Sequence, residues 1–176
     1  MANRKKLATV WLDGCSGCHM SFLDVDEGLL ALLEVADLVY SPLVDNKIFP
    51  PDVDITLIEG EVSNDDDLHK IKMVRERTKT LVSLGDCAVT ANVPSMRNSV
   101  PGGVSAILDR VSAGNSPKQP ADVPLLCSKA QPVHHHVKVD VFVPGCPPSS
   151  HTILYVVQEL LAGRQPDLLE KTRFGA

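Results

Sequence analysis

The sequence predicts an α/β fold in a single domain, built on a flavodoxin-like, doubly wound and mostly parallel sheet. Five short apolar runs rich in β-branched residues alternate along the 176-residue chain with segments of helical periodicity. Near-continuous apolar runs of this length are typical of parallel strands buried on both faces. The length suits one domain, which we expect to span residues 1–176, and no internal repeat is visible.

The expected strands occupy residues 7–12, 37–40, 55–58, 80–84 and 137–143. The first expected helix, residues 21–35, repeats apolar side chains every three or four positions, as at Phe22, Val25 and Leu29. The second, residues 63–79, does the same, and Ser63 with the acidic run 65–67 suits capping and the positive end of a helix. Shorter helical patterns cover residues 104–111 and about 149–162. Residues 112–136 are expected to form a long loop, and about 164–176 a polar C-terminal arm.

Composition excludes several classes of function. The net charge of −5 argues against a nucleic-acid partner, because phosphate binding needs a basic face. No apolar stretch approaches the roughly 20 residues that span a bilayer, and no secretory signal is recognisable, so we expect no membrane span and a cytoplasmic location. Thiols stay reduced there, which favours metal or redox chemistry for the five cysteines over disulfides.

Four of the cysteines follow expected strands. Cys15 and Cys18 come directly after the first, Cys87 after the fourth and Cys146 after the fifth. The carboxyl ends of parallel strands share one edge of the sheet, where ligands bind near the switch point, so these four thiols are expected to converge. Four thiolates are the ligands of a [4Fe–4S] cluster, and we interpret this set as the ligands of one such cluster.

Glycines accompany these cysteines, at Gly14, Gly17, Gly85 and Gly145. Glycine permits tight turns whose N–H groups approach a bound anion. Helices beginning after Cys18 and after Cys146 would point their positive ends at the cluster. We expect Pro147, directly after Cys146, to keep water from the sulfur and so tune the reduction potential.

Three alternatives remain for the cysteines. They could be unrelated buried thiols, because a lone cysteine usually behaves as a small hydrophobe. They could hold a structural zinc, although such sites usually come as two close pairs and only one is present here. A thioredoxin-like redox pair would leave Cys87 and Cys146 without a role.

With these residues in view, the chain resembles the small subunit of [NiFe] hydrogenases and the related cluster-bearing 20 kDa subunit of respiratory complex I. The resemblance rests on Gly-Cys-Ser-Gly-Cys-His-Met-Ser at 14–21, Glu-Gly at 59–60, Gly-Asp-Cys at 85–87 and Val-Asp-Val-Phe-Val-Pro-Gly-Cys-Pro-Pro at 139–148. It implies that Cys15, Cys18, Cys87 and Cys146 bind the proximal [4Fe–4S] cluster.

The string Cys-His-Met-Ser-Phe-Leu-Asp at 18–24 is most similar to cytoplasmic NAD-reducing (bidirectional) hydrogenases. With no cysteine after Cys146, one cluster is expected. The resemblance implies a large subunit with the Ni–Fe centre and diaphorase subunits with FMN, an NAD site and further Fe–S clusters. Electrons from H2 oxidation would then pass through this cluster toward NAD+, with no complete active site in this chain alone. The alternatives are a subunit of a complex I-like or membrane energy-converting assembly, and a zinc-stapled interaction module.

The sequence also allows expectations for several other polar and aromatic residues. Glu59, at the end of a buried strand, is either a proton relay or interface group, or an acid that complements a helix end. His19 either donates a hydrogen bond to a cluster sulfur, contacts the large subunit, or does neither. Asp86 is expected to bond local backbone in a turn. Trp11 and Phe142 are expected in the core or at the large-subunit interface.

One cysteine and three histidines match no ligand of the family. Cys127 is expected to be a free thiol, or else a substitute ligand or redox-sensitive group. The run His134, His135 and His136 is expected in a loop and strand start facing solvent or a partner, because neighbouring side chains of a strand alternate between its faces and cannot share one ion.

Overall fold

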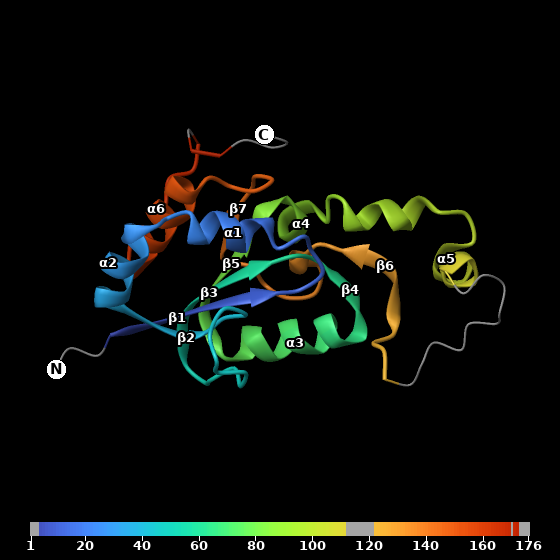
Figure 1. Ribbon diagram of the computed structural model, residues 1–176, viewed down its shortest axis with the longest axis horizontal. Coiled ribbons are helices and arrows are strands. Elements are labelled where there is room, and N and C mark those ends of the chain that lie inside the picture. Colours follow the sequence, from blue (N-terminus) through green and yellow to red (C-terminus); the bar gives the residue numbers. More distant parts are fainter. Residues whose placement is uncertain (1–3, 112–121, 170, 173–176) are drawn as a thin grey trace.

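The central sheet has five strands, all paired in parallel. The computed structural model describes residues 4–111, 122–169 and 171–172. Its strands run in the order β2-β1-β3-β5-β7 (Figure 1). Their bounds are β1 Lys5–Trp11, β2 Ala36–Tyr40, β3 Val53–Glu59, β5 Thr78–Leu84 and β7 Val141–Val143. Counted within this sheet the order is 2-1-3-4-5, that of a flavodoxin-like doubly wound fold, so the predicted fold class is confirmed.

The apolar runs form the strands because both faces of the sheet are covered. Leu7 pairs with Ile55, and Val10 with Ile58, with all four side chains at most 2% exposed. All five expected strands are present, but β7 begins at Val141 and not at residue 137. The residues before it are occupied by the 3-10 helix η2, Val133–His135, and the bend that follows. The histidine run therefore lies in a helical turn, and its expected place at a strand start was wrong.

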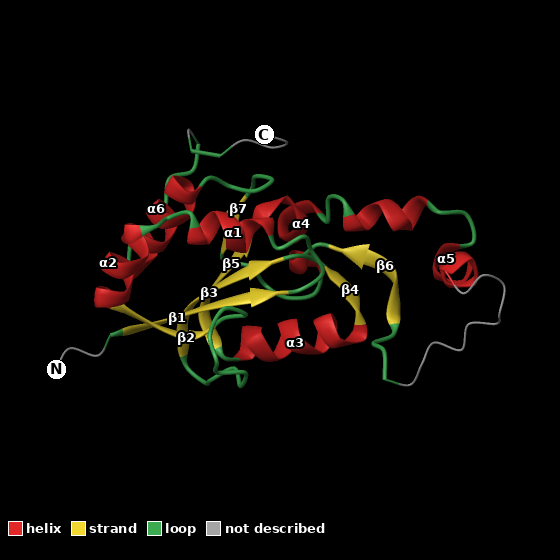
Figure 2. Ribbon diagram, viewed as in Figure 1, coloured by secondary structure: helices red, strands yellow, loops and turns green. Residues whose placement is uncertain are grey.

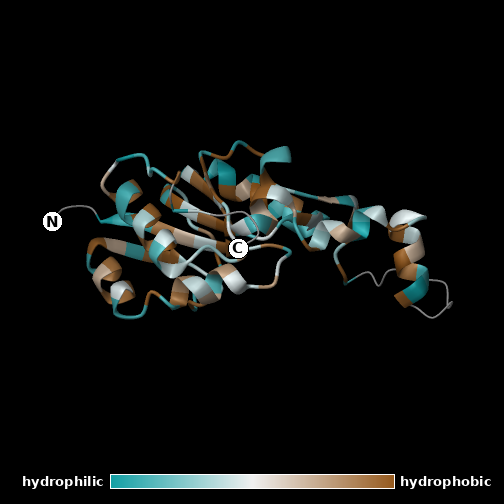
Figure 3. Ribbon diagram, turned by 90° about the horizontal axis from the view of Figure 1, so that it is seen from above, coloured by the Kyte–Doolittle hydropathy of each residue, from teal (hydrophilic) through white to brown (hydrophobic). Residues whose placement is uncertain are grey.

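Helices cover the two faces of the sheet as two layers (Figure 2). One apolar layer joins α1 (Gly17–Leu23), α2 (Glu27–Val35) and α6 (Ser150–Leu161) to the sheet through Phe22, Leu32 and Val156. The other joins α3 (Asp65–Glu76) and α4 (Gly85–Thr90) through Ile71 and Ala88. Seen from above, hydrophobic strands lie inside the helical layers (Figure 3). The core thus holds the sheet rigid beneath the loops at its carboxyl edge.

The predicted helix 21–35 is in fact two helices. The chain turns between α1 and α2, where Asp26 has a φ of 53°. Aspartate adopts such left-handed backbone more readily than most residues, and its side chain competes with helical hydrogen bonds. The break lets Phe22 and Leu32, one on each helix, reach the same apolar layer.

The second helix starts at Asp65 and ends at Glu76, so it is shorter than residues 63–79. Asn64 caps it, because its Oδ1 accepts from the N–H of Asp67 at 2.9 Å. The three aspartates lie in the first turn, as predicted, but Ser63 belongs instead to strand β4, Val62–Asn64.

A second, two-stranded sheet lies beyond the carboxyl edge of the first (Figure 1). Strand β6, Leu126–Gln131, pairs antiparallel with β4, and the 3-10 helix η1, Pro94–Ser99, and helix α5, Gly103–Val111, pack beside it. The prediction of a structureless loop over 112–136 was therefore wrong for 126–131 and 133–135, while residues 112–121 lie outside the described part. β6 was missed because it is half polar and lacks the strong alternation of a surface strand.

The C-terminal segment, from residue 164, contains no helix or strand in its described residues, 164–169 and 171–172. It still packs back on the domain. Thr152 donates its hydroxyl hydrogen to the Lys171 carbonyl at 2.9 Å, and Lys171 Nζ lies 4.5 Å from the centre of the Tyr155 ring. Across the described ranges, no helix combines the length and apolar character needed to cross a bilayer.

Candidate metal centre

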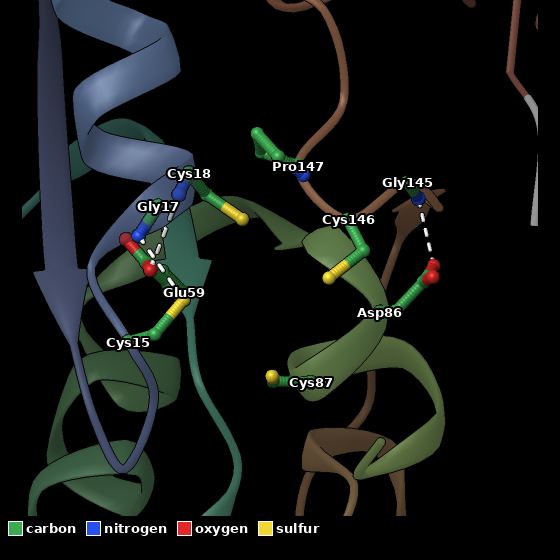
Figure 4. Close-up of a pocket in the computed structure, with 9 residues that line it drawn as sticks. All are labelled: Cys15, Gly17, Cys18, Glu59, Asp86, Cys87, Gly145, Cys146 and Pro147. Carbon is green, nitrogen blue, oxygen red and sulfur yellow. Dashed lines mark hydrogen bonds between the residues drawn. The ribbon is translucent and has the colours of Figure 1, made fainter. Parts of the chain in front are cut away.

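The four predicted cysteines come together at the carboxyl edge of the main sheet. Cys15 lies in the loop after β1 and Cys18 in the first turn of α1. Cys87 lies in α4 directly after β5, and Cys146 follows β7. All four side chains line one cavity of about 110 Å³ (Figure 4), so their predicted convergence is confirmed.

The cavity is larger than a single ion needs. One water needs roughly 10–15 Å³ by the same measure. Gly17, Glu59, Asp86, Gly145 and Pro147 complete its lining. Gly14 lies outside this lining and faces a wider, open cavity of about 310 Å³ that shares Cys15, Cys87 and Cys146 with it.

Glycine is required at position 85. Its φ is +82°, and a Cβ atom there would lie 2.2 Å from the Sγ atom of Cys18. At Gly145, with a φ of +140°, a Cβ would lie 2.7 Å from the backbone of Pro148. Gly85 thus lets the loop of Cys87 approach Cys18 more closely than any side chain would permit, and Gly145 permits the tight turn that leads into Pro147 and Pro148.

Asp86 ties two of these loops together. Its Oδ1 accepts from the N–H of Gly145 at 2.7 Å (Figure 4). Its own N–H donates to the Gly145 carbonyl at 2.9 Å. The predicted role in a local turn was wrong, because the carboxylate reaches a loop 59 residues away. The two bonds fix Cys87 and Cys146, the next residues along, relative to each other.

Glu59 holds the first cysteine loop from beneath. It is 2% exposed and accepts from the backbone N–H groups of Cys18 and His19, at 3.3 and 2.9 Å. The reading as an acid at a helix end is confirmed, and an interface role is wrong because the side chain is buried. Its role as a proton relay stays a prediction. Glu59 accepts two N–H groups at the start of α1, but Gly17 and Cys18 line the cavity and Gly17 N–H donates to Cys15 Sγ. The predicted placement of the α1 N-terminus at the thiols is therefore confirmed.

His19 points away from the sulfurs. Its Nδ1 contacts Glu59 Oε2, and its Nε2 lies 2.9 Å from the hydroxyl of Thr9. The ring is 6% exposed. With both nitrogens engaged, neither a bond to a cluster sulfur nor contact with a partner is available, so those expectations were wrong.

Three N–H groups do reach the thiols, and the sequence did not single out two of the residues that provide them. Asn92 donates its Nδ2 hydrogen to Cys146 Sγ at 3.6 Å, and the backbone of Val93 bonds the Cys87 thiol. Gly17 N–H donates to Cys15 Sγ at 3.4 Å. Hydrogen bonds to the sulfurs are one way in which proteins set cluster potentials. Asn92 and Val93 follow Cys87 within a few residues, which was the one available signal.

Burial keeps the inner thiols protonated when no metal is bound. Desolvation, followed by the nearby thiols of Cys15 and Cys146, raises the pKa of Cys87 to about 11. Burial, then the Glu59 carboxylate, also raises the pKa of Cys18 strongly. Metal binding must therefore displace protons from this pocket, as is usual when thiolates become ligands.

The donors lie too far apart for a single ion. Within the described part of the chain, no three Cys, His, Asp or Glu side chains lie close enough to hold one metal ion. Tetrahedral zinc needs thiolates within about 3.8 Å of one another, given Zn–S bonds of about 2.3 Å. Four thiols around a cavity of this size fit a polynuclear group better.

The rim of the open cavity is apolar. Val93 and Pro94, the first residue of η1, line it, and Val93 is 60% exposed. Met96 lies two residues further along η1 and is 69% exposed. Trp11, 44% exposed, donates its indole hydrogen to the carbonyl of Gly14 on the same rim. Trp11 and Phe142, which is 41% exposed, are therefore not core residues. Exposed apolar groups around a binding site mark a surface that a partner covers.

The remaining candidates lie outside the thiol cavity. Cys127 is a half-buried free thiol on β6 and does not line it. His134 stacks edge-on against His135 and Phe142, with ring centres 4.7 and 5.6 Å away. His136 is half-buried, with its Nε2 lacking a partner. The three rings do not converge on one point.

The chain matches a known family over most of its length. Residues 15–160 match the family model described as NADH ubiquinone oxidoreductase, 20 Kd subunit. The chain is 38% identical over 187 residues to the NAD-reducing hydrogenase HoxS subunit delta of Cupriavidus necator, an alignment covering 95% of this chain and 85% of that protein. It is 37% identical over 177 residues to one subunit of the F420-non-reducing hydrogenase of Methanothermobacter marburgensis, covering 96% of this chain and 57% of that relative.

A solved structure has the same fold throughout. A chain of an NAD+-reducing [NiFe]-hydrogenase in the H2-reduced state superposes with a TM-score of 0.90 at 36% identity, covering 98% of this chain and 99% of that one. A chain of the Dm. baculatum [NiFeSe]-hydrogenase matches with a TM-score of 0.58 at 17% identity, which shows a shared fold alone.

Proposed function

The chain belongs to the family of the NADH ubiquinone oxidoreductase 20 kDa subunit, and its match to hydrogenase subunits along nearly its whole length makes it a hydrogenase small subunit; from this premise we propose that it relays electrons from H2 oxidation through one [4Fe–4S] cluster toward NAD+. The Ni–Fe site would lie in a large subunit. The observation that carries the proposal is the single cavity lined by Cys15, Cys18, Cys87 and Cys146. We propose these four as the ligands.

The geometry supports a bound cluster in three ways. Four thiols from three distant parts of the chain line one space. Glycine at position 85 leaves room beside the Cys18 sulfur. N–H donors reach the sulfurs of Cys15 and Cys146. When bound, the cluster supplies one-electron redox chemistry, and the chain's own contribution is to hold the ligands and exclude water.

Each supporting residue has a task in this proposal. Glu59 anchors the loop of Cys15 and Cys18 through the backbone, and Asp86 locks Cys87 to Cys146. Pro147 lines the cavity beside Cys146, where it would shield that sulfur from water. None of these side chains makes or breaks a bond in H2.

The partners belong to the proposal as well. Trp11 and Val93 expose apolar side chains beside the cavity that Cys15, Cys87 and Cys146 line, so we assign this face to the Ni–Fe large subunit, which would cover it. Diaphorase subunits with FMN, an NAD site and further Fe–S clusters would receive the electrons. The complex would work in the cytoplasm, where the thiols stay reduced before assembly.

Replacing Cys146 by serine in the assembled complex tests the proposal. A serine oxygen is a poor substitute for a thiolate, so cluster assembly and H2-dependent NAD+ reduction should both fall sharply. Iron analysis and EPR of the anaerobically purified complex, before and after reduction, measure the first effect. The matched control is Cys127→Ser, which removes a thiol outside the cavity and should leave iron and activity unchanged.

Different outcomes of this experiment test the ligand assignment and the electron relay separately. Full iron and wild-type activity in Cys146→Ser would count against the ligand assignment. A colourless wild-type protein holding zinc would remove the electron relay and favour an interaction module.

The similarity to an F420-non-reducing hydrogenase provides a second candidate for the electron acceptor. If the wild-type complex reduces an acceptor other than NAD+ with H2, and Cys146→Ser loses that activity, the electron relay stands and NAD+ is not its acceptor. Co-purification with membrane subunits would favour a complex I-like assembly instead.

A further inference from the structure

Glu61 is a buried carboxylic acid with no partner, and its backbone is paired with that of Asp13, which lines the wider cavity together with Cys15, Cys87 and Cys146. Its side chain is 0% exposed, and neither carboxylate oxygen has a hydrogen-bond partner. Its backbone is fully used, because Glu61 N–H donates to the Asp13 carbonyl at 2.8 Å and Asp13 N–H donates back at 3.1 Å. The backbone of Glu61 is therefore held in place, while its two carboxylate oxygens have no hydrogen-bond donor.

The nearest cation is held elsewhere. Arg97 donates from one terminal nitrogen to the Cys127 carbonyl at 3.0 Å, and from the other to the Ser63 carbonyl at 2.8 Å. Its Nε is also buried and without a partner. The guanidinium thus spans β4 and β6 and makes no ion pair with Glu61. Its charge only partly offsets the cost of an anion in this interior.

Four charged or titratable groups act on this site from the surrounding elements. They are Asp13 after β1, Asp67 on α3, Arg97 on η1 and the Cys87 thiol on α4. Burial is the main cause that raises the pKa of Glu61, to about 8, and Asp13 adds to it. An unpartnered buried carboxylate is costly, so a proton is the natural partner here.

We propose that Glu61 takes up a proton when the cluster held by the four cysteines gains an electron. This inference rests on the proposed function. The electron comes from a one-electron donor, which is the partner subunit in the complex, and the proton comes from solvent and forms the O–H bond of the acid. As that bond forms, the O–H bond of the solvent hydronium ion or water that gives up the proton breaks.

The coupling follows from charge. An added negative charge beside Cys87 disfavours a second anion at Glu61 and so favours its protonated form. By reciprocity, a proton on Glu61 favours the reduced cluster. The proton would come from the side of the cavity that Asp13 lines, because the Asp13 backbone is paired with that of Glu61.

The test is the pH dependence of the cluster's midpoint potential in the assembled complex. The cluster signal is identified by EPR as the one that Cys146→Ser loses. In the wild type, its potential should fall as pH rises through the range in which Glu61 loses its proton, by at most about 59 mV per pH unit, the value for a tenfold change in a one-electron couple. Glu61→Gln keeps the side-chain shape and cannot titrate, so its potential should not change over the same range.

The matched control is Glu76→Gln, at the exposed end of α3, which should behave as the wild type. Infrared difference spectra of the wild type provide a second readout, because reduction should produce a carboxylic acid C=O band. That readout decides the question even if Glu61→Gln fails to assemble. A constant wild-type potential, or an equal slope in Glu61→Gln, with the cluster intact, overturns this inference alone. Absence of any cluster in the wild type overturns the proposed function with it.

Discussion

Replacing Gly85 by alanine should remove the cluster while leaving the fold in place. The added Cβ would lie 2.2 Å from Cys18 Sγ, far inside van der Waals contact, so the thiol or the loop must move. The same substitution places alanine at a φ of +82°, which L residues disfavour by about 1–2 kcal/mol. Forced overpacking adds typically about 1–3 kcal/mol.

A second glycine separates these two effects. Gly163, after α6, has a φ of +75° and nothing within 4 Å of a Cβ, so Gly163→Ala carries the backbone cost without the clash. A gain of about 0.4–1 kcal/mol from the less flexible unfolded chain offsets part of that cost. Gly163→Ala should therefore lose about 1 kcal/mol, or roughly 2–4 °C in Tm, and Gly85→Ala two to four times as much.

Iron content per chain and thermal unfolding of the assembled complex measure the two variants side by side. We expect Gly163→Ala to keep the iron of the wild type and Gly85→Ala to lose most of it. Equal iron in both variants, with an unchanged EPR signal, would refute the reasoning that position 85 leaves room for the Cys18 sulfur.

Three further perturbations follow from the site. Asp86→Ala removes the acceptor of Gly145 N–H, so the loops of Cys87 and Cys146 should separate more easily and iron should be lost faster to a chelator. Asn92→Ala removes an N–H donor to Cys146 Sγ, which should lower the cluster's reduction potential in an EPR-monitored titration. Glu61→Gln removes an acid whose pKa is raised to about 8, so the wild type, but not the variant, should lose about 3 kcal/mol of stability between pH 5 and 8.

The sign of the last effect follows from proton binding. With a pKa near 8 in the folded state and an ordinary value when unfolded, Glu61 holds its proton more tightly when folded. Its contribution to the free energy of unfolding is therefore lost as pH rises from about 5 and levels off above 8. Denaturant unfolding across that range, taken as the difference between variant and wild type, measures it. A constant difference would contradict the assignment.

Matched substitutions keep the other two predictions specific. Asp140→Ala also removes a carboxylate that accepts a distant backbone N–H, that of Leu81 at 2.8 Å, but this contact lies away from the thiols. The variant should therefore lose stability and keep its iron. Asn98→Ala removes an amide bonded to Ala130 and should leave the potential unchanged. Equal iron loss in both aspartate variants would mean that Asp86→Ala acts only through general destabilisation. Equal shifts of the reduction potential in both asparagine variants would mean the same for Asn92→Ala.

The sequence by itself determined the sheet and the places of its thiols. Apolar runs such as residues 80–84 are typical of buried parallel strands, and a cysteine that directly follows a parallel strand must lie at the carboxyl edge. Cys87 and Cys146 could therefore be placed beside Cys15 and Cys18 without coordinates. These are local signals, read within a few residues of each strand end.

Only the tertiary structure decided which polar groups support those thiols. Glu59 reaches His19 across 40 positions, and Asp86 reaches Gly145 across 59. Strand β6 exists because β4 pairs with it, and its own residues carry little β signal. Glu61 looks like any acid of a loop until packing removes its water and leaves it without a partner. Such contacts join residues far apart in sequence, so their energies depend on a geometry that no local pattern encodes.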